Sequence, residues 1–352
     1  IPWDLDRNYG GVTILPPHIK TDGGEWYSGT ANAVYQNKEF IDYYNPDYVI
    51  ILSADHVYKM DYEIMLHFHK ERKADVTIAA IEVPIEEAHR YGVIIEDGQN
   101  RVIRFEEKPE HPSNNLVSMG IYIFNWSLLK EALASNHMVH GRSDFGKHII
   151  PYCLRSGYQL YAYHFDGFWR DVGTLQSYWE TNMELVKIVP DFNLYEEYWR
   201  IYSNNGSLAP QYTGDNAEIK TSIISEAAEI YGKVYNSVIG NNVQIGEDTI
   251  VWNSIIMDHT KIGKGCTIEN AIIAEEVVIG NDIEIGYGDW QENIYDPDIY
   301  CTDLVVIAEN SIIPSHVKIG KNSAISGITD YEDYKDYILL PGSYLVKEGE
   351  RS

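Results

Sequence analysis

The sequence predicts a two-part chain of the α/β class, in which an α/β domain precedes a parallel β-helix. Three observations support this fold class. The front half alternates short apolar runs with amphipathic stretches. From residue 219 onward, Ile-Gly pairs recur mostly 6 or 17 residues apart, at 239/240, 245/246, 262/263, 279/280, 285/286 and 319/320. Between the halves lies a polar stretch rich in Tyr, Gly, Asn and Pro, which interrupts both patterns.

The front half begins with a strand-helix-strand pattern. Residues 46–55, PDYVIILSAD, predict a buried parallel strand with Asp55 at its carboxyl end. Residues 62–75 predict a helix, and residues 75–84 predict a second buried strand that Pro84 ends. This order indicates a right-handed crossover and a sheet covered on both faces.

The rest of the front half continues the alternation. Residues 118–126 predict a strand, residues 127–135 a helix, and residues 158–173 a strand that runs into a loop. Residues 175–188 predict a further helix with Thr174 as its N-cap.

The back half predicts the coils of a solenoid, because an aliphatic residue followed by a corner Gly or Asn recurs at a fixed period. A period of 17 rather than 18 indicates a coil that lacks one corner residue, and residues 287–303 interrupt the register as an inserted loop. Strands of an antiparallel sandwich are the alternative, which the regular period disfavours. We expect domains at residues 1–190 and 217–352, joined by a linker at residues 191–216.

Composition limits the possible functions. The formal net charge of −26 argues against a basic nucleic-acid surface, and a phosphorylated substrate would need local Lys, Arg or metal to bind. We expect no membrane span, because no apolar run is long enough. Three cysteines without metal-ligand spacing indicate unpaired, buried thiols in a reducing cytoplasm. The chain opens on Ile1 without Met or signal peptide, which we interpret as a piece of a longer product.

Several residues fit the chemistry of joining a sugar phosphate to a nucleoside triphosphate, which needs metal-binding carboxylates, a cation for the phosphate and close backbone approach. Asp55 and Asp171 each follow a strand-like run. Glu107 and Lys108 lie side by side before Pro109, and the segment WYSGTANAV at 26–34 joins aromatic residues to a Gly and a small-residue helix start. Each feature has a plainer interpretation as a cap, a solvated turn or a core aromatic.

The order of these segments decides between the interpretations. WYSGTANAV, ILSADHVYKMDY, ADVTIAAIEVP, RYGVI, FEEKP, SMGIYIFNW, DFGKHIIP and FWRDVGT together resemble glucose-1-phosphate adenylyltransferases, the ADP-glucose pyrophosphorylases of bacterial glycogen synthesis. The resemblance covers nearly the whole chain. It implies a Rossmann-like, GT-A-like nucleotidyltransferase domain with a mixed, mainly parallel sheet, followed by a left-handed parallel β-helix of hexapeptide repeats.

The resemblance also implies roles for single residues. Asp55 and Asp171 would hold a catalytic Mg²⁺, Lys108 would bind the phosphate of glucose 1-phosphate, and Glu107 would bind the sugar hydroxyls. The remaining substrate residues would be Gly92 and Ser118 in the glucose pocket, and Tyr27, Gly29 and Thr30 beside the nucleotide, which would be ATP.

The chain departs from the family pattern in three ways. It has no GGxGTRL-type loop to hold the triphosphate, so we expect the chain as given to lack its N-terminal segment and to be inactive. Asn32 replaces a usual Asp, and Ala54 replaces a usual Gly. The alternatives are a non-catalytic regulatory subunit of the same enzyme, or an enzyme that uses UTP or dTTP.

Two further expectations concern the β-helix. An acyltransferase would need a His base at a coil interface, but His259 and His316 lie in ordinary coil contexts. Because a solenoid end must be covered, we expect the β-helix to pack against the α/β domain and help to build a homotetramer, or a heterotetramer with a related subunit. Allosteric control is typical of the family.

Overall fold

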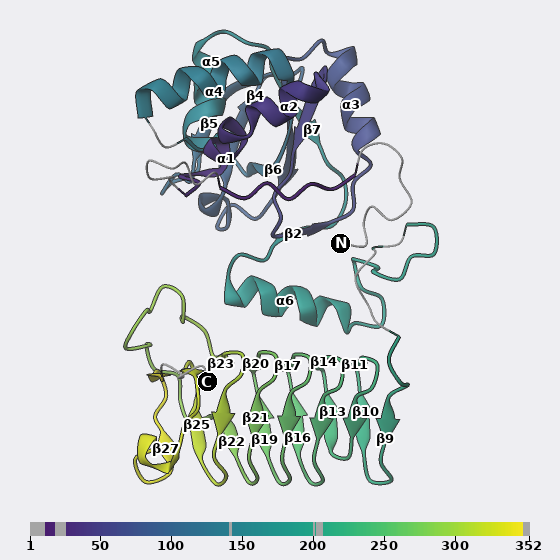
Figure 1. Ribbon diagram of the computed structural model, residues 1–352, viewed down its shortest axis with the longest axis vertical. Helices are drawn as coiled ribbons and strands as arrows, with labels where there is room; N and C mark the ends of the chain where they lie inside the picture. The colour runs from purple at the N-terminus through teal and green to yellow at the C-terminus, as the bar shows by residue number, and fades with distance from the viewer. Residues whose placement is uncertain (1–10, 18–25, 141–142, 200, 202–206, 348–352) are drawn as a thin grey trace. The chain divides into compact units, whose positions relative to one another are not determined.

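The structure is a computed structural model, and it describes residues 11–17, 26–140, 143–199, 201 and 207–347. The chain divides into two compact units (Figure 1). The first comprises residues 1–54 and 58–169, and the second comprises residues 55–57 and 170–352. Each unit is described by itself. The boundaries expected at residues 190 and 216 stay a prediction.

The first unit contains a six-stranded sheet in the order β5-β4-β6-β3-β7, with β1 also paired to β6. The strands are β1 (Tyr48–Ile51), β3 (Val76–Glu82), β4 (Gly92–Glu96), β5 (Val102–Glu107), β6 (Leu116–Asn125) and β7 (Leu160–His164). The helices are α1 (Thr30–Gln36), α2 (Lys38–Tyr44), α3 (Tyr62–Glu71), α4 (Trp126–His140) and α5 (Ile150–Arg155), with a 3₁₀ turn at Ala88–Arg90 and a π-helical turn at Phe145–Ile149.

The sheet is mixed. The pairing directions require β1, β3, β4 and β7 to run one way and β5 and β6 to run the other, so most strands share one direction. However, β6 lies between strands that run against it, and only β3 and β7 pair in parallel. The expectation of a buried parallel strand at residues 46–55 is therefore wrong in two respects. β1 pairs antiparallel with β6, and its residues are half-buried or exposed.

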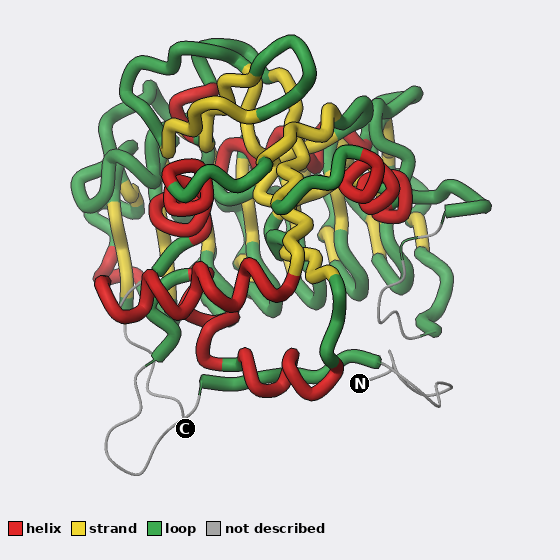
Figure 2. The backbone as a smooth tube through the Cα atoms, turned by 90° about the horizontal axis from the view of Figure 1, so that it is seen from above, coloured by secondary structure: helices red, strands yellow, loops and turns green. Residues whose placement is uncertain are grey.

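Helices cover both faces of this sheet, as the strand-helix-strand order predicted. On one face, α1, α4, α5 and the π-helical turn pack on β3, β6 and β7 in an apolar core centred on Phe124, Leu129 and Ile149. On the other face, Met65 of α3 packs with Met119 and Ile121 of β6. The successive side chains of β6 point to opposite faces, so this strand contributes to both cores. Figure 2 shows the helices in red against the yellow strands.

A buried histidine links α3 to the sheet and should make the stability of this unit depend on pH. His69 is 1% exposed, and its ring nitrogens lie 2.7 Å from Thr77 Oγ1 and 3.3 Å from Asn125 Oδ1. Burial lowers the pKa of His69 below its usual 6.5. The unfolded chain therefore binds more protons than the native one, so the free energy of unfolding should fall as the pH drops below about 6.5.

The substitution His69→Gln tests this expectation. Because glutamine does not titrate, urea unfolding at several values between about pH 5 and pH 7 should show a shallower loss of stability than in the wild type. Equal slopes in the two proteins would mean that other groups control the acid sensitivity.

The second unit is dominated by a β-solenoid with three parallel sheets, whose rungs are labelled in Figure 1. One sheet contains β9 (Tyr212–Thr213), β12 (Glu229–Ile230), β15 (Gln244–Ile245), β18 (Lys261–Ile262), β21 (Val278–Ile279) and β24 (Ile312–Ile313). The second contains β10 (Glu218–Lys220), β13 (Lys233–Tyr235), β16 (Ile250–Trp252), β19 (Thr267–Glu269), β22 (Glu284–Tyr287), β25 (Lys318–Gly320) and β27 (Ile338–Leu339). The third contains β11 (Ile223–Ile224), β14 (Val238–Ile239), β17 (Ile255–Ile256), β20 (Ala271–Ile273), β23 (Val305–Ile307), β26 (Ala324–Ser326) and β28 (Tyr344–Val346).

The 17-residue period read from the sequence is the length of a regular coil. Lys233 pairs with Ile250 and Ile250 with Thr267, and in the sheet begun by β11 the pairing jumps from Ala271 to Val305 across the inserted loop. β9 pairs with β12, so the first coil includes Tyr212 and Thr213, which we expected in the linker. The inward-facing aliphatic residues of the coils form one continuous core.

The corners explain why Asn and Gly recur beside the aliphatic residues. Asn236, Asn253 and Asn270 repeat at the same corner with φ of 43° to 50°, a left-handed conformation that Asn tolerates better than most residues. Asn236 Nδ2 also donates to Asn253 Oδ1 across 2.6 Å. His259 and His316 occupy corners of the same kind, with φ of 61° and 64°. Their positions serve the turns of the coil.

One helix packs along the solenoid. α6 (Leu175–Leu185) begins at Thr174, whose hydroxyl accepts from the backbone N–H of Ser177 in a capping box, as expected from the sequence. Met183 of α6 lies in an apolar cluster with Ile255 and Ile272 of the third sheet. The outer face of that sheet is therefore covered (Figure 1).

The three cysteines form no disulfide. Cys153 and Cys266 are buried, as predicted, but Cys301 is exposed because it lies in the inserted loop rather than in a coil. Across the described residues, no helix combines the length and the apolar character needed to cross a membrane.

Candidate active site

Two predicted carboxylates come together in the second unit. β2 (His56–Tyr58) and β8 (Trp169–Asp171) form a two-stranded sheet, so Asp55 precedes one strand and Asp171 ends the other. The N–H of Val172 donates to the carbonyl of Asp55 across 3.2 Å. One ligand atom from each of Asp55, His56 and Asp171 lies within 4.8 Å of the others.

Gly173 leaves room for this pair. Its N–H donates to Asp171 Oδ1 across 2.7 Å, and a Cβ at this position would lie 2.9 Å from the same oxygen and 3.8 Å from Asp55 Oδ2. The added atom would crowd both carboxylates. This close approach gives a physical reason for glycine in the WRDVGT segment.

The donor set fits a hard divalent cation. Two carboxylates are the protein ligands that Mg²⁺ prefers, and the side chain of Asp55 is 61% exposed, so a phosphate-bound ion can reach it. His56 is more buried, and its Nε2 lies 3.6 Å from Asp55 Oδ1. Imidazole suits softer metals, so the two carboxylates fit Mg²⁺ better than His56 does. Sequence reasoning missed His56, although the SADH segment places it beside Asp55.

In the first unit, the Glu107 carboxylate packs against the backbone of two glycines, Gly92 and Gly146. It is the last residue of β5 and pairs in register with Gly92 of β4. A Cβ at Gly92 would lie 3.1 Å from Glu107 Oε2, and a Cβ at Gly146 would lie 2.2 Å from the same atom. Burial, and secondarily the charge of Asp144, raise the pKa of Glu107, whereas the charges of Lys108 and Lys147 lower it. The fold therefore holds a partly desolvated carboxylate at this place.

Lys108 follows Glu107 in an unusual backbone conformation. Its φ is 45°, although a residue before proline normally adopts an extended conformation. The N–H of Lys108 donates to the carbonyl of Tyr91 across 3.1 Å, which fixes the turn, and the side chain is exposed. Strain held in this way is common at functional positions.

Ser118 belongs to the same neighbourhood through a tyrosine. Ser118 Oγ donates to the hydroxyl of Tyr122 across 3.3 Å, and both residues are buried. The Tyr122 ring stacks on Phe145 at 5.7 Å. Burial raises the pKa of Tyr122 to about 12, and the nearby charges of Glu107 and Asp144 act in the same direction. Tyr122 therefore stays a neutral hydroxyl beside Glu107.

Gly29 and Thr30 join the start of α1 to the turn that carries Gly146. Gly29 has a φ of 112°, and a Cβ there would lie 2.4 Å from the carbonyl oxygen of Ser143. Thr30 Oγ1 donates to Asp144 Oδ2 across 2.9 Å. Gly29 is thus required for close backbone approach, and the Thr30 hydroxyl has a structural partner.

Tyr27 and Asn32 make local contacts. The hydroxyl of Tyr27 donates to the carbonyl of Leu15 across 2.7 Å and accepts from Asn37 Nδ2 across 2.8 Å. Asn32 is 2% exposed, and its Oδ1 accepts from the N–H of Ser28 and from the side chain of Gln36. An amide at position 32 therefore serves the entry to α1.

Apart from Tyr27, Gly29 and Thr30, the predicted residues form two groups. Gly92, Glu107 and Lys108 lie together in the first unit, with Ser118 linked to them through Tyr122. Asp55 and Asp171 lie together in the second. Sequence reasoning missed Tyr122, Asp144 and Gly146, although the SMGIYIFNW and DFGKHIIP segments contain them.

The raised pKa of Glu107 leads to a prediction about stability. Because burial disfavours the ionised form, this carboxyl contributes stability below its unfolded pKa of about 4.5, and that contribution is lost as the pH rises through the higher native value. Glu107→Gln should therefore raise the melting temperature at pH 7, with no gain below about pH 4.5. A lower melting temperature at pH 7 would contradict this account.

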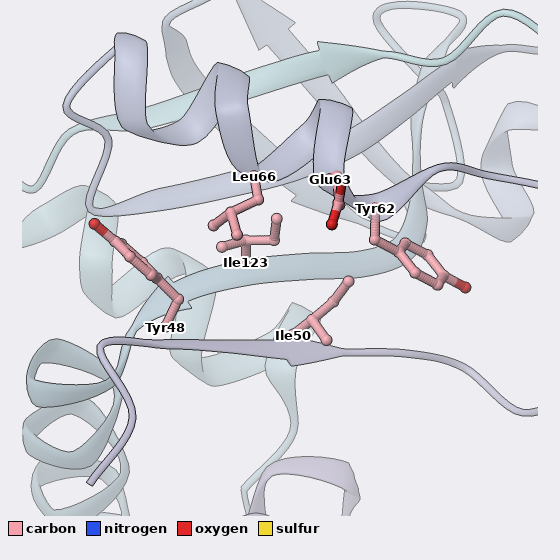
Figure 3. Close-up of a pocket in the computed structure, with 6 residues that line it drawn as sticks. All are labelled: Tyr48, Ile50, Tyr62, Glu63, Leu66 and Ile123. Carbon is pink, nitrogen blue, oxygen red and sulfur yellow. The ribbon is translucent and has the colours of Figure 1, made fainter.

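A separate cavity in the first unit carries no such chemistry. It has a volume of about 190 Å³, and Figure 3 shows its walls from β1, α3 and β6, which are Tyr48, Ile50, Tyr62, Glu63, Leu66 and Ile123. The lining is almost wholly apolar, with Glu63 as its single charged residue.

Comparison with known proteins agrees with both units. The nucleotidyl transferase family model matches residues 7–188, and a model described as GlmU-like, C-terminal hexapeptide, matches residues 207–295. Glucose-1-phosphate adenylyltransferase of Lachnospira eligens is 57% identical over 99% of this chain and 82% of that protein. The enzymes of the same name from Thermotoga maritima and Acetivibrio thermocellus are 52% and 45% identical, over 99% of this chain and 83% and 82% of their own lengths. The nucleotidyl transferase domain contains the Asp55–Asp171 pair and the adjacent Glu107 and Lys108, and a hexapeptide solenoid follows it. Together with these identities, this shows that the chain belongs to the glucose-1-phosphate adenylyltransferase family.

Proposed function

We propose that this chain forms ADP-glucose and pyrophosphate from ATP and α-D-glucose 1-phosphate, for glycogen synthesis in the cytoplasm. The observation that carries the proposal is the Asp55–Asp171 pair, because transfer of an adenylyl group to a phosphate oxygen needs a cation to offset the charge of the triphosphate. Identity of up to 57% to enzymes of that name supports the choice of substrates.

In this proposal, Asp55 and Asp171 would hold Mg²⁺, with His56 beside the first carboxylate. Nucleotidyl transferases of this family generally use divalent metal ions. The ion would neutralise charge on the triphosphate and on the leaving pyrophosphate. The positions of Asp55 and Asp171 would determine where the ion offsets this charge.

The Glu107 group binds the sugar phosphate. Lys108 contacts its phosphate, and the Glu107 carboxylate accepts hydrogen bonds from sugar hydroxyls, with Gly92 and Ser118 lining the pocket. A phosphate oxygen of the sugar attacks the α-phosphorus of ATP, the bond to the β-phosphate breaks, and pyrophosphate leaves. No covalent enzyme intermediate is required. Gly29, Thr30 and Tyr27 border the nucleotide, Gly29 through close backbone approach.

Release of pyrophosphate with glucose 1-phosphate and ATP, UTP or dTTP tests the proposal. The assay is run on this chain and on the chain joined to the part of the Lachnospira eligens enzyme that it does not cover. ATP should be used at least about tenfold better than either alternative. A preference for UTP or dTTP would show that the nucleotide substrate is not ATP. If neither protein released pyrophosphate, the chain would instead fit a regulatory subunit. We also propose that the chain assembles into a homotetramer, or into a heterotetramer with a related subunit. A monomer in light scattering would contradict this assembly.

A further inference from the structure

Lys147 occupies a firmly held position in the π-helical turn Phe145–Ile149. Asp144 caps this turn, and its Oδ1 accepts from the N–H of Lys147 across 3.0 Å. The other oxygen of Asp144 accepts from Thr30 Oγ1. Both carboxylate oxygens are therefore used, and the backbone of Lys147 is tied to the start of α1. Short π-helical turns are frequent at functional sites.

The turn lies directly on the Glu107 carboxylate. A Cβ at Gly146 would approach Glu107 Oε2 to 2.2 Å, so the backbone of Gly146, the neighbour of Lys147 in the chain, lies against this carboxylate. The charges of Lys147 and Lys108 both act on Glu107 and lower its pKa, against the larger effect of burial. Two lysines from different segments are therefore near enough to Glu107 for their charges to act on it.

The amino group of Lys147 is available for a ligand. The side chain is exposed, and within the described parts of the chain no carboxylate forms an ion pair with its Nζ, although several other lysines there form such pairs. Lys130, an exposed lysine of the same unit, is bound to Asp42 at 3.0 Å.

We propose that Lys147 is a second phosphate-binding cation, which contacts the phosphate of the sugar phosphate together with Lys108. This inference rests on the proposed function. A phosphate monoester carries about −1.5 to −2 charges at pH 7, and one lysine offsets only part of that charge. The need is larger here, because Glu107 adds a carboxylate beside the substrate and the whole chain has a formal net charge of −26.

The substitution Lys147→Met removes the charge and keeps most of the side-chain stem. We expect the Kd for glucose 1-phosphate, from isothermal titration in the presence of Mg²⁺ and a non-hydrolysable ATP analogue, to rise about tenfold. Lys147→Arg should restore most of the affinity. The matched control is Lys73→Met, which removes the same charge from an exposed turn of the same unit and should leave the Kd unchanged.

Binding of the ATP analogue distinguishes a contact with the sugar phosphate from a contact with the triphosphate. The Kd for the ATP analogue should be the same in Lys147→Met and wild type. A loss that falls mainly on the analogue would assign Lys147 to the triphosphate instead, and an equal loss for both ligands would contradict a contact specific to the sugar phosphate. Raising the salt concentration should weaken glucose 1-phosphate binding less in Lys147→Met than in wild type.

Unchanged glucose 1-phosphate affinity in Lys147→Met, with an active wild type, overturns this inference alone. A wild type that releases no pyrophosphate and binds no glucose 1-phosphate, even when joined to the additional segment of its relative, overturns the proposed function and this inference with it.

Discussion

Replacing Asp55 or Asp171 with asparagine is expected to lower the turnover number for pyrophosphate release by about a thousandfold. Each substitution keeps the size of the side chain and removes one of the two negative charges of the proposed cation site. The loss should appear mainly in kcat. Negative charge builds up on the leaving pyrophosphate as its bond to the α-phosphorus breaks, so the cation contributes most in the transition state.

The dependence of activity on metal concentration is the second measurement for this prediction. Raising the Mg²⁺ or Mn²⁺ concentration should rescue part of the activity in Asp55→Asn, because a weakened site fills at higher concentration. Asp215→Asn is the matched control, since it removes a charge from an exposed turn of the same unit. Melting temperatures should be similar in all these variants. Full activity of Asp55→Asn at ordinary Mg²⁺ concentration would remove the acidic pair from the mechanism.

Replacing Gly146 with alanine is expected to lower kcat/KM for glucose 1-phosphate about a hundredfold while the protein stays folded. The new Cβ would lie 2.2 Å from Oε2 and 2.7 Å from Cδ of Glu107, so the carboxylate must move. The clash involves the end of a flexible side chain and no backbone atom, and alanine favours helical backbone more than glycine does.

The comparison with other substitutions makes this prediction specific. Gly98→Ala places a Cβ where no atom lies within 4 Å, so its activity and its melting temperature should match the wild type. In Gly146→Ala the KM for ATP should change much less than the KM for glucose 1-phosphate. If both glycine variants kept full kcat/KM, the position of the Glu107 carboxylate would not matter for the reaction.

The solenoid shows what a local pattern determines. The 17-residue period, the aliphatic core positions and the inserted loop at residues 287–303 all follow from the repeat, because each coil contacts mainly its neighbours. Thr174 caps α6 for a similarly local reason, since a cap and its N–H partner lie three residues apart.

The α/β unit shows what the local pattern leaves open. An apolar run at residues 46–55 is compatible with either pairing direction, and only the placement of β6 made β1 antiparallel. Cys301 was expected to be buried with the other cysteines, although it lies within the inserted loop read from the sequence. A loop between coils can pack onto the solenoid or extend into solvent, and only the structure shows that Cys301 is exposed.

For the candidate site as well, the sequence determined some features and the tertiary structure determined others. The sequence by itself, through the order of its motifs, determined Asp55, Asp171, Glu107 and Lys108 as candidates, because each chemistry depends on residue type. Only the tertiary structure decided that Gly146 lies under Glu107 and that Asp144 joins the turn to Thr30, 114 residues away. Contacts across such separations depend on how the whole chain closes its loops, and no short segment encodes them.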